Sequence, residues 1–116
     1  LEEQMVKYVA IEKQNGEIHT YNSLAELTAE IELVDVESDI YKVYNSQGII
    51  QNLSIKKKEN KVLGLFKIDG SRIIVNDSGE QRSEELIAYI SNYARVHGLS
   101  INGKTLDVIL EELGEV

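Results

Sequence analysis

Cysteine and proline are absent from this sequence, and no part of it is apolar over the length that a membrane span requires. Without cysteine there is neither a disulfide framework nor thiol chemistry. A transmembrane helix needs about 20 consecutive apolar residues, and a secretion signal needs a basic and then apolar leader; neither is found. We therefore expect a soluble cytoplasmic protein with no membrane partner. The absence of proline gives no functional hint.

The length of 116 residues fits one domain, 1–116, which is large enough to form a core of its own. Met5 is the candidate native start, so Leu1–Gln4 are read as added residues and are left out of the fold argument.

Positive charge is scarce and unevenly placed. The chain has 12 Lys and Arg against 20 Asp and Glu, a formal net charge of −8. Six of the 12 cations lie within residues 53–73, where the net charge is +4, whereas residues 1–52 carry −7 and residues 74–116 carry −5. A basic segment inside an acidic chain is the most informative feature of the composition.

Alternating apolar residues predict several strands, joined by tight turns. Asn15-Gly16 and Asp69-Gly70 are strong hairpin signals, because a type I′ turn needs a positive φ at both central residues. A turn at Asp69-Gly70 places Lys67 opposite Arg72, and Glu59-Asn60 is a candidate turn before it, which gives a three-stranded meander. The expected strands are Met5–Glu12, Glu17–Tyr21, Ile40–Asn45, Leu53–Lys58, Val62–Ile68 and Arg72–Val75.

Three stretches have helical spacing. Ser23 and Glu26 form a capping box for a helix from Leu24 to Glu32. Ser83 is the expected N-cap of a second helix, which runs to His97 and ends at Gly98. The third covers Lys104–Leu113, and Leu33–Asp39 fits either a strand or a helix. The buried stripe of the second helix is expected to contain Leu86, Tyr89, Ile90, Tyr93 and His97.

The predicted class is α+β, with helices segregated from strands. The sheet is expected to be curved and mostly antiparallel, an open or partly closed small barrel of about six strands. One short helix follows the first hairpin, and two helices lie at the C-terminus.

Catalytic, metal and cofactor sites are not predicted. Gly98–Thr105 matches the phosphate-loop pattern, but a helix precedes it and no downstream strand can supply the magnesium carboxylate. The two histidines are far apart and have no cysteine partners. Asp35, Glu37 and Asp39 would share one face of a strand, and a solvent-exposed acidic face explains them more simply than a cation site does. The helix–loop–helix of residues 84–113 is not expected to recognise DNA, because its second helix carries Asp107, Glu111 and Glu112 and would repel phosphates. We therefore expect no enzyme.

The basic hairpin is the remaining candidate site. Positive groups beside aromatic rings can hold single-stranded nucleic acid, although lysines at strand ends also protect sheet edges. The leading hypothesis is a small regulatory binding protein that contacts RNA or single-stranded DNA. The candidate residues are Lys56, Lys57, Lys58, Lys61, Lys67, Arg72, Tyr41 and Tyr44.

The alternative is a protein-interaction module, an adaptor or inhibitor that uses its acidic surface or the lysine hairpin. Nucleic-acid binding predicts that the lysines and tyrosines share one concave surface. A protein-interaction module predicts that they are separated and that an apolar patch or a free sheet edge is exposed. A third possibility, a small molecule inside the barrel, requires a cavity.

Overall fold

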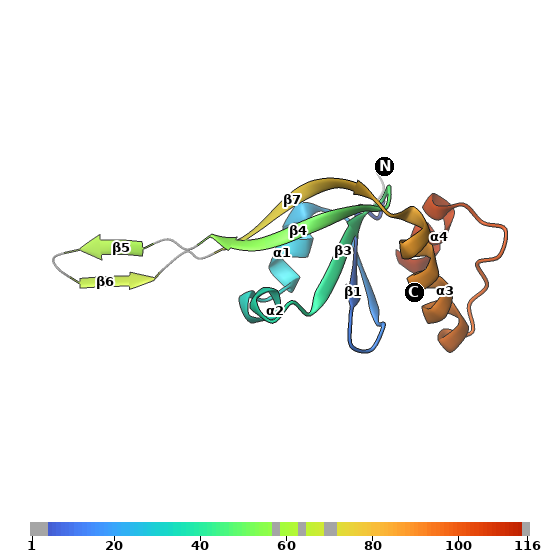
Figure 1. The fold of residues 1–116 in the computed structure, drawn as a ribbon, viewed down its shortest axis with the longest axis horizontal. Coiled ribbons are helices and arrows are strands. Elements are labelled where there is room, and N and C mark those ends of the chain that lie inside the picture. Colours follow the sequence, from blue (N-terminus) through green and yellow to red (C-terminus); the bar gives the residue numbers. More distant parts are fainter. Residues whose placement is uncertain (1–4, 57–58, 63–64, 69–71, 115–116) are drawn as a thin grey trace.

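A computed structural model describes residues 5–56, 59–62, 65–68 and 72–114, with side chains over 5–56 and 72–114. Five strands form one antiparallel sheet in the order β2-β1-β3-β4-β7, and β5 pairs with β6 (Figure 1). The α+β class is therefore confirmed. The elements are β1 (Tyr8–Glu12), β2 (Ile18–Tyr21), α1 (Leu24–Glu30), α2 (Leu33–Glu37), β3 (Tyr41–Asn45), β4 (Ile49–Lys56), β5 (Glu59–Val62), β6 (Leu65–Ile68), β7 (Arg72–Gln81), α3 (Ser83–His97) and α4 (Leu106–Gly114).

The expected barrel is wrong, because the sheet is open, with β2 and β7 at its edges. The course of β4 explains why. This strand pairs with β3 only at Val43↔Gln51 and Tyr44↔Ile50, and then continues beside β7 as far as Lys56↔Arg72. The outer strands thus leave the sheet as a two-stranded ribbon instead of curling toward β2 (Figure 1).

The predicted pairing across Asp69-Gly70 is also wrong. Arg72 lies opposite Lys56, and Lys67 lies opposite Asn60, so the two residues are not partners. The turn itself falls outside the described residues. Glu59 and Asn60 are strand residues of β5, not a turn. The local Asp-Gly signal did not reveal that Leu53 and Ile55 would pair with Val75 and Ile73 and join β7 to the larger sheet.

A bulge interrupts β7 where it meets the body of the sheet. Between Ile49↔Gln81 and Gln51↔Asp77, β7 uses two more residues than β4. Side chains of the same strand bind two amides there: Gly79 N donates to Asp77 Oδ1 at 2.7 Å, and Glu80 N donates to Ser78 Oγ at 3.0 Å. Regular pairing along β7 is thereby confined to the stretch from Arg72 to Asp77.

Two short helices, not one, follow the first hairpin. Ser23 Oγ accepts a bond from Glu26 N at 3.1 Å, as predicted, while Glu26 Oε1 accepts from Asn22 N rather than from Ser23 N. The ambiguous segment after α1 forms α2. The acidic run therefore does not share one strand face: Asp35 accepts a bond from Glu32 N, and Asp39 pairs with Lys13 at 2.7 Å.

The C-terminal helices differ from expectation at their ends. Arg82 is the N-cap of α3, and Ser83 instead donates its hydroxyl proton to Gln47 O at 3.0 Å. Gly98 has the left-handed conformation expected of a helix stop, with φ of 74°. His97 is exposed and does not belong to the buried stripe, whose fully buried members are Leu86, Ile90 and Ala94.

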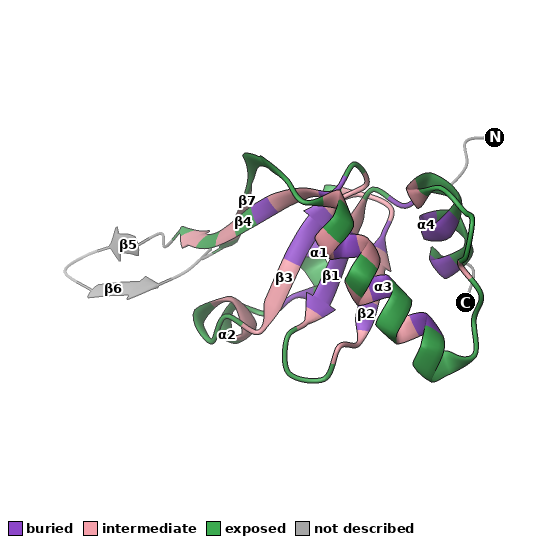
Figure 2. Ribbon diagram, turned by 45° about the vertical axis from the view of Figure 1, so that its right-hand side comes forward, coloured by how far each residue is buried: buried purple, intermediate pink, exposed green. Residues whose placement is uncertain are grey.

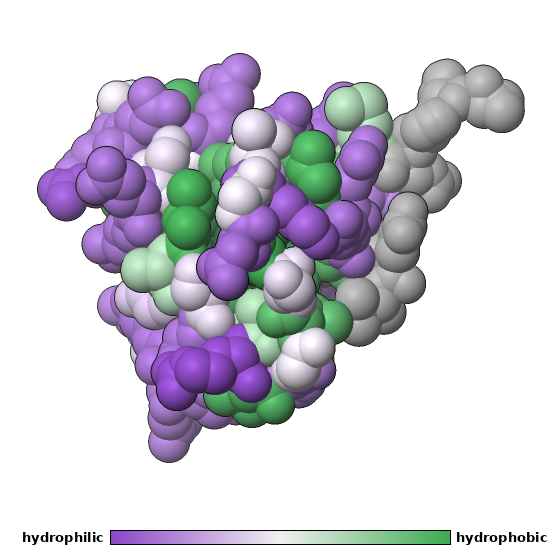
Figure 3. Space-filling model, turned by 90° about the vertical axis from the view of Figure 1, so that its right-hand side faces the viewer, coloured by the Kyte–Doolittle hydropathy of each residue, from purple (hydrophilic) through white to green (hydrophobic). Residues whose placement is uncertain are grey.

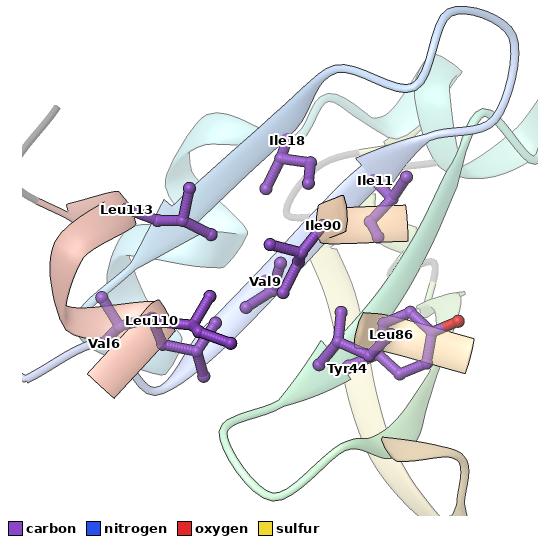
Figure 4. Packing of buried hydrophobic residues seen from close by; sticks show 10 residues of the cluster. Val6, Val9, Ile11, Ile18, Tyr44, Leu86, Ile90, Leu110 and Leu113 are labelled. Atoms are coloured by element: carbon purple, nitrogen blue, oxygen red, sulfur yellow. The ribbon is translucent and has the colours of Figure 1, made fainter. Parts of the chain in front are cut away.

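The centre of the sheet is covered on both faces. On one face, Val9, Ile11 and Tyr44 pack against α3 and α4 (Figure 4). On the other, Ala10 and Val43 pack with α1. Figure 2 shows this buried centre and the mostly exposed surface of β7, which has no buried residue. The first core comprises Val6, Val9, Ile11, Ile18, Tyr44, Leu86, Ile90, Ile109, Leu110 and Leu113.

Candidate functional site

The predicted basic residues lie on the ribbon that leaves the sheet. We call residues 52–76 the arm, and the remaining described residues, 5–51 and 77–114, the body. The pair Lys56↔Arg72 joins β4 to β7, and the pair Glu59↔Ile68 joins β5 to β6. Glu59 is three positions after Lys56 and Ile68 is four positions before Arg72, so β5 and β6 continue the same antiparallel arm (Figure 1). Lys61 is a residue of β5 and Lys67 of β6, whereas Lys57 and Lys58 fall outside the described residues.

Lys56 and Arg72 are brought directly opposite each other, and both side chains are exposed. Side chains in such a pair have Cβ atoms about 5 Å apart, and like charges in this position destabilise a sheet. Among the residues whose side chains are described, no carboxylate forms an ion pair with either cation. Among the described side chains, the repulsion between these two cations is therefore uncompensated.

Cations of the body are placed differently. Lys13 pairs with Asp39 at 2.7 Å, Lys42 with Glu85 at 2.8 Å, and Lys104 with Glu112 at 2.8 Å. Arg82 pairs with Glu80. Internal ion pairing thus neutralises much of the positive charge of the body, but not the described charge of the arm.

Tyr44 is fully buried beneath α3 and cannot stack on a ligand in this conformation. Its hydroxyl donates to Glu85 Oε1 at 2.5 Å, and Lys42 pairs with the same carboxylate. Burial, together with this hydrogen bond, raises the pKa of Tyr44. The hydrogen bonds from Lys42 and Tyr44 lower the pKa of Glu85. No local pattern in the sequence predicts this network, because Tyr44 and Glu85 are 41 residues apart.

Tyr41 lies on the opposite face of β3 from Tyr44. It packs on the α1 side of the sheet, and its ring meets His19 edge-on at 6.1 Å. Burial raises the pKa of Tyr41. The structure thus brings Lys56 and Arg72 together but does not gather the two tyrosines on one surface with them.

Apolar side chains take the place of aromatic rings on the described part of the arm. Leu53, Ile73 and Val75 are half-buried on the α1 side. Ile74 is half-exposed and belongs to neither core. Because β7 is an edge strand, the described part of the arm presents an apolar sheet edge with Lys56 and Arg72 at one end.

A cavity of about 380 Å³ lies where β3 and β4 diverge. Its four charged lining residues are already bonded within the chain. Lys13 pairs with Asp39, Lys42 with Glu85, and Asp35 accepts from Glu32 N. It therefore lacks the free convergent charges that mark many ligand sites, and we assign no function to it.

The phosphate-loop pattern has a structural role here. Gly98 ends α3, and the loop joins α3 to α4. The amine of Lys104 donates to Ser100 O at 3.0 Å and to Glu112 Oε1 at 2.8 Å, so it is held by its own loop and helix. Within the described ranges, no group of three or more potential ligands could hold a metal ion.

The exposed end formed by α3 and α4 is mixed in character. Figure 3 shows apolar groups scattered among polar ones on this face, without one continuous apolar patch. Val96 (70% exposed) and Val108 (40%) are the large apolar residues that α3 and α4 expose. Scattered residues of this kind are common on protein surfaces, so the arm remains the strongest candidate site.

No family model, no curated protein and no solved structure matches this chain. In the part of the chain that the structure describes, no helix is long and apolar enough to cross a membrane.

Proposed function

We propose that this chain is a non-enzymatic binding protein whose arm contacts an acidic surface of a protein partner. The observation that carries the proposal is the exposed pair of Lys56 and Arg72, opposite each other and without an ion-pair partner among the described side chains. A sequence that departs from a local rule while the rest obeys it often does so at a functional site. A carboxylate placed between the two cations relieves their repulsion.

The arrangement of the tyrosines favours a protein over single-stranded nucleic acid. Stacking of bases needs exposed rings beside the cations, whereas Tyr44 is buried and Tyr41 lies on the other face of β3. The described residues beside the cations are aliphatic and lie on an edge strand, which suits strand addition by an extended peptide.

Contact with RNA or single-stranded DNA remains the second candidate. Its support is the same unpaired charge, because phosphates could replace carboxylates between Lys56 and Arg72. It differs from the first candidate in needing no apolar complementarity.

The test measures binding of the chain to three labelled probes across a salt series. The probes are a short peptide of alternating Glu and Val, its Lys-Val counterpart, and a mixed pool of single-stranded RNA and DNA. We expect the Glu-Val peptide to bind, the Lys-Val peptide not to bind, and salt to weaken the complex. Preferential binding of the oligonucleotides, with a steep salt slope, would select the second candidate.

The variant that decides the site is Lys56→Glu/Arg72→Glu, which should abolish binding. Its matched control is Lys7→Glu/Arg95→Glu, which changes the net charge equally at two exposed cations of the body and should leave binding intact. Equal losses in both variants, or no binding of any probe at low salt, would contradict a role for the arm.

A further inference from the structure

We infer that the arm binds its partner as an added strand that runs antiparallel to β7 along Arg72–Asp77, with apolar side chains on the face toward α1 and a carboxylate at its C-terminal end on the other face. The inference rests on the proposed function, because it uses the same arm and the same kind of partner. It adds the form of the bound segment, its direction and the pattern of its side chains.

The β7 edge is open along six residues. β7 pairs with β4 from Arg72 to Asp77 and has no other strand partner in the described chain. In an antiparallel pair, the backbone groups of alternate residues point away from the partner strand, so this stretch offers donors and acceptors to one more strand. Regular pairing ends at the bulge that follows Asp77. The stretch from Arg72 to Asp77 therefore sets the length of the added segment.

The two faces of this edge have different side chains. Ile73 and Val75 pack on the side of the sheet that α1 and α2 cover. Because side chains alternate along a strand, Arg72 and Ile74 lie on the other face, together with Lys56, the cross-strand partner of Arg72. The side chains of an added strand alternate in the same way. Apolar residues of the partner would therefore lie next to Ile73 and Val75, and its carboxylate would lie next to Arg72.

The two ends of the edge carry opposite charges. Lys56 and Arg72 lie at one end, and Asp77 lies at the other. The carboxylate of Asp77 is exposed, accepts a bond from the amide of Gly79, and forms no ion pair with the described side chains. Opposite charges on neighbouring strands attract each other, and like charges repel. The edge therefore favours a segment that is acidic only at the end beside Arg72.

The direction of the segment follows from the type of sheet. All strand pairs of the described chain are antiparallel. Antiparallel pairing is also slightly more stable per residue than parallel pairing. β7 runs from Arg72 toward the body (Figure 1). An antiparallel segment therefore begins beside Asp77 and ends beside Arg72, which places its acidic residue at its C-terminal end.

These requirements define a six-residue sequence for the bound segment. The two positions beside Val75 and Ile73 are apolar, and the position between them, beside Ile74, is uncharged. The last position, beside Arg72, is acidic. The first two positions, at the Asp77 end, are polar and not acidic. The peptide Thr-Thr-Val-Thr-Val-Glu satisfies all of these conditions, and we call it the matched peptide.

The experiment compares three peptides of equal composition, acetylated and amidated at their ends, by titration into the full chain followed by NMR. They are the matched peptide, its reverse Glu-Val-Thr-Val-Thr-Thr, and Thr-Thr-Val-Thr-Glu-Val, which moves the carboxylate to the α1 face. We expect the matched peptide to bind and the other two to bind roughly fivefold more weakly, because each loses a favourable cross-strand pair. Amide hydrogen exchange should slow within Arg72–Asp77 and stay unchanged along β2, the other edge of the sheet.

A charge exchange tests the position of the carboxylate directly. The variant Lys56→Glu/Arg72→Glu should prefer Thr-Thr-Val-Thr-Val-Lys to the matched peptide, which reverses the preference of the wild type. This reversal also shows that the variant is folded. The control Lys7→Glu/Arg95→Glu changes the net charge equally at exposed positions of the body and should keep the preference of the wild type.

Four results would overturn the inference: equal binding of the three peptides, tighter binding of the reverse, slowed exchange only outside Arg72–Asp77, or the same preference in Lys56→Glu/Arg72→Glu as in the wild type. If the Glu-Val peptide still bound the wild type and lost binding in that variant, the proposed function would stand without the added strand. If no acidic peptide bound the wild type, the proposed function would be overturned as well.

Discussion

The body and the arm of this protein differ in how they pair charges and pack apolar side chains, although β4 and β7 run through both. In the body, Lys42 meets Glu85, Tyr44 bonds the same carboxylate, and apolar side chains fill two cores. In the arm, Lys56 faces Arg72 and Ile74 packs in neither core. The body pairs four of its six cations with carboxylates and buries much of its apolar surface, whereas the described cations of the arm, Lys56 and Arg72, form no ion pair with the described side chains. The following predictions test this difference, beginning with the largest expected effect.

Truncation of a core residue should separate the two regions most clearly. Leu86→Ala removes a fully buried side chain and should lower the free energy of unfolding by about 2–5 kcal/mol. Ile74→Ala, at the half-exposed arm, should lower it by about 1 kcal/mol or less when measured at low protein concentration. Urea unfolding checks both values. Similar losses at the two positions would mean that the arm is as well packed as the body.

Removal of one hydroxyl should reveal the buried network of the body. Tyr44→Phe keeps the ring but leaves Glu85 without one of its two donors, and should cost about 1–3 kcal/mol of unfolding free energy. Tyr41→Phe is the matched control at a ring without a hydrogen bond to a carboxylate, and should be nearly neutral. If the two substitutions cost the same, the Tyr44–Glu85 bond contributes nothing specific.

Acid should lower the free energy of unfolding, because it protonates Glu85. Because Lys42 and Tyr44 hold the pKa of Glu85 below its ordinary value of 4.5, its contribution is present above that pH and is lost as the pH falls through the lowered value. Glu85→Gln should therefore flatten the fall of stability below about pH 4.5. Unfolding curves at stepped pH measure this slope. An unchanged slope would mean that Glu85 does not contribute to the loss of stability in acid.

Reversal of one charge should give the arm an ion pair like those of the body. Lys56→Glu places a carboxylate opposite Arg72, and should raise the free energy of unfolding by about 0.2–1 kcal/mol at low protein concentration. The same change should weaken binding through the arm. Thermal melting and the peptide assay measure the two effects. Lys7→Glu, at the exposed residue just before β1, should change neither the free energy of unfolding nor the binding.

Local signals in the sequence correctly located most of the body. The Ser23 cap, the Gly98 helix stop and a turn at Asn15-Gly16 each depend on neighbours in the chain, and all three are found. The turn is not of type I′, because Gly16 has a positive φ and Asn15 does not. His97 and Ser83 were misplaced because helix periodicity leaves the end of an element uncertain by a residue or more.

The pairing of β4 with β7 could not be read from such local signals. Arg72 was expected to face Lys67, five residues away, but it faces Lys56, and only tertiary packing decides between these registers. The charge of the candidate site was visible in the sequence. The like-charged pair and the burial of Tyr44 were not, because both depend on which strand lies beside which.

The bulge in β7 bears on how far association through this sheet can spread. An unprotected edge strand can recruit further chains without limit and start a fibril. Here the amides of Gly79 and Glu80 are already bound by side chains of their own strand, so the ladder cannot lengthen toward the body. A second strand would find only the short stretch beyond the bulge, and once that stretch is occupied, no equivalent edge remains on β7. The irregularity would thus limit association along β7 to one short stretch, from Arg72 to Asp77.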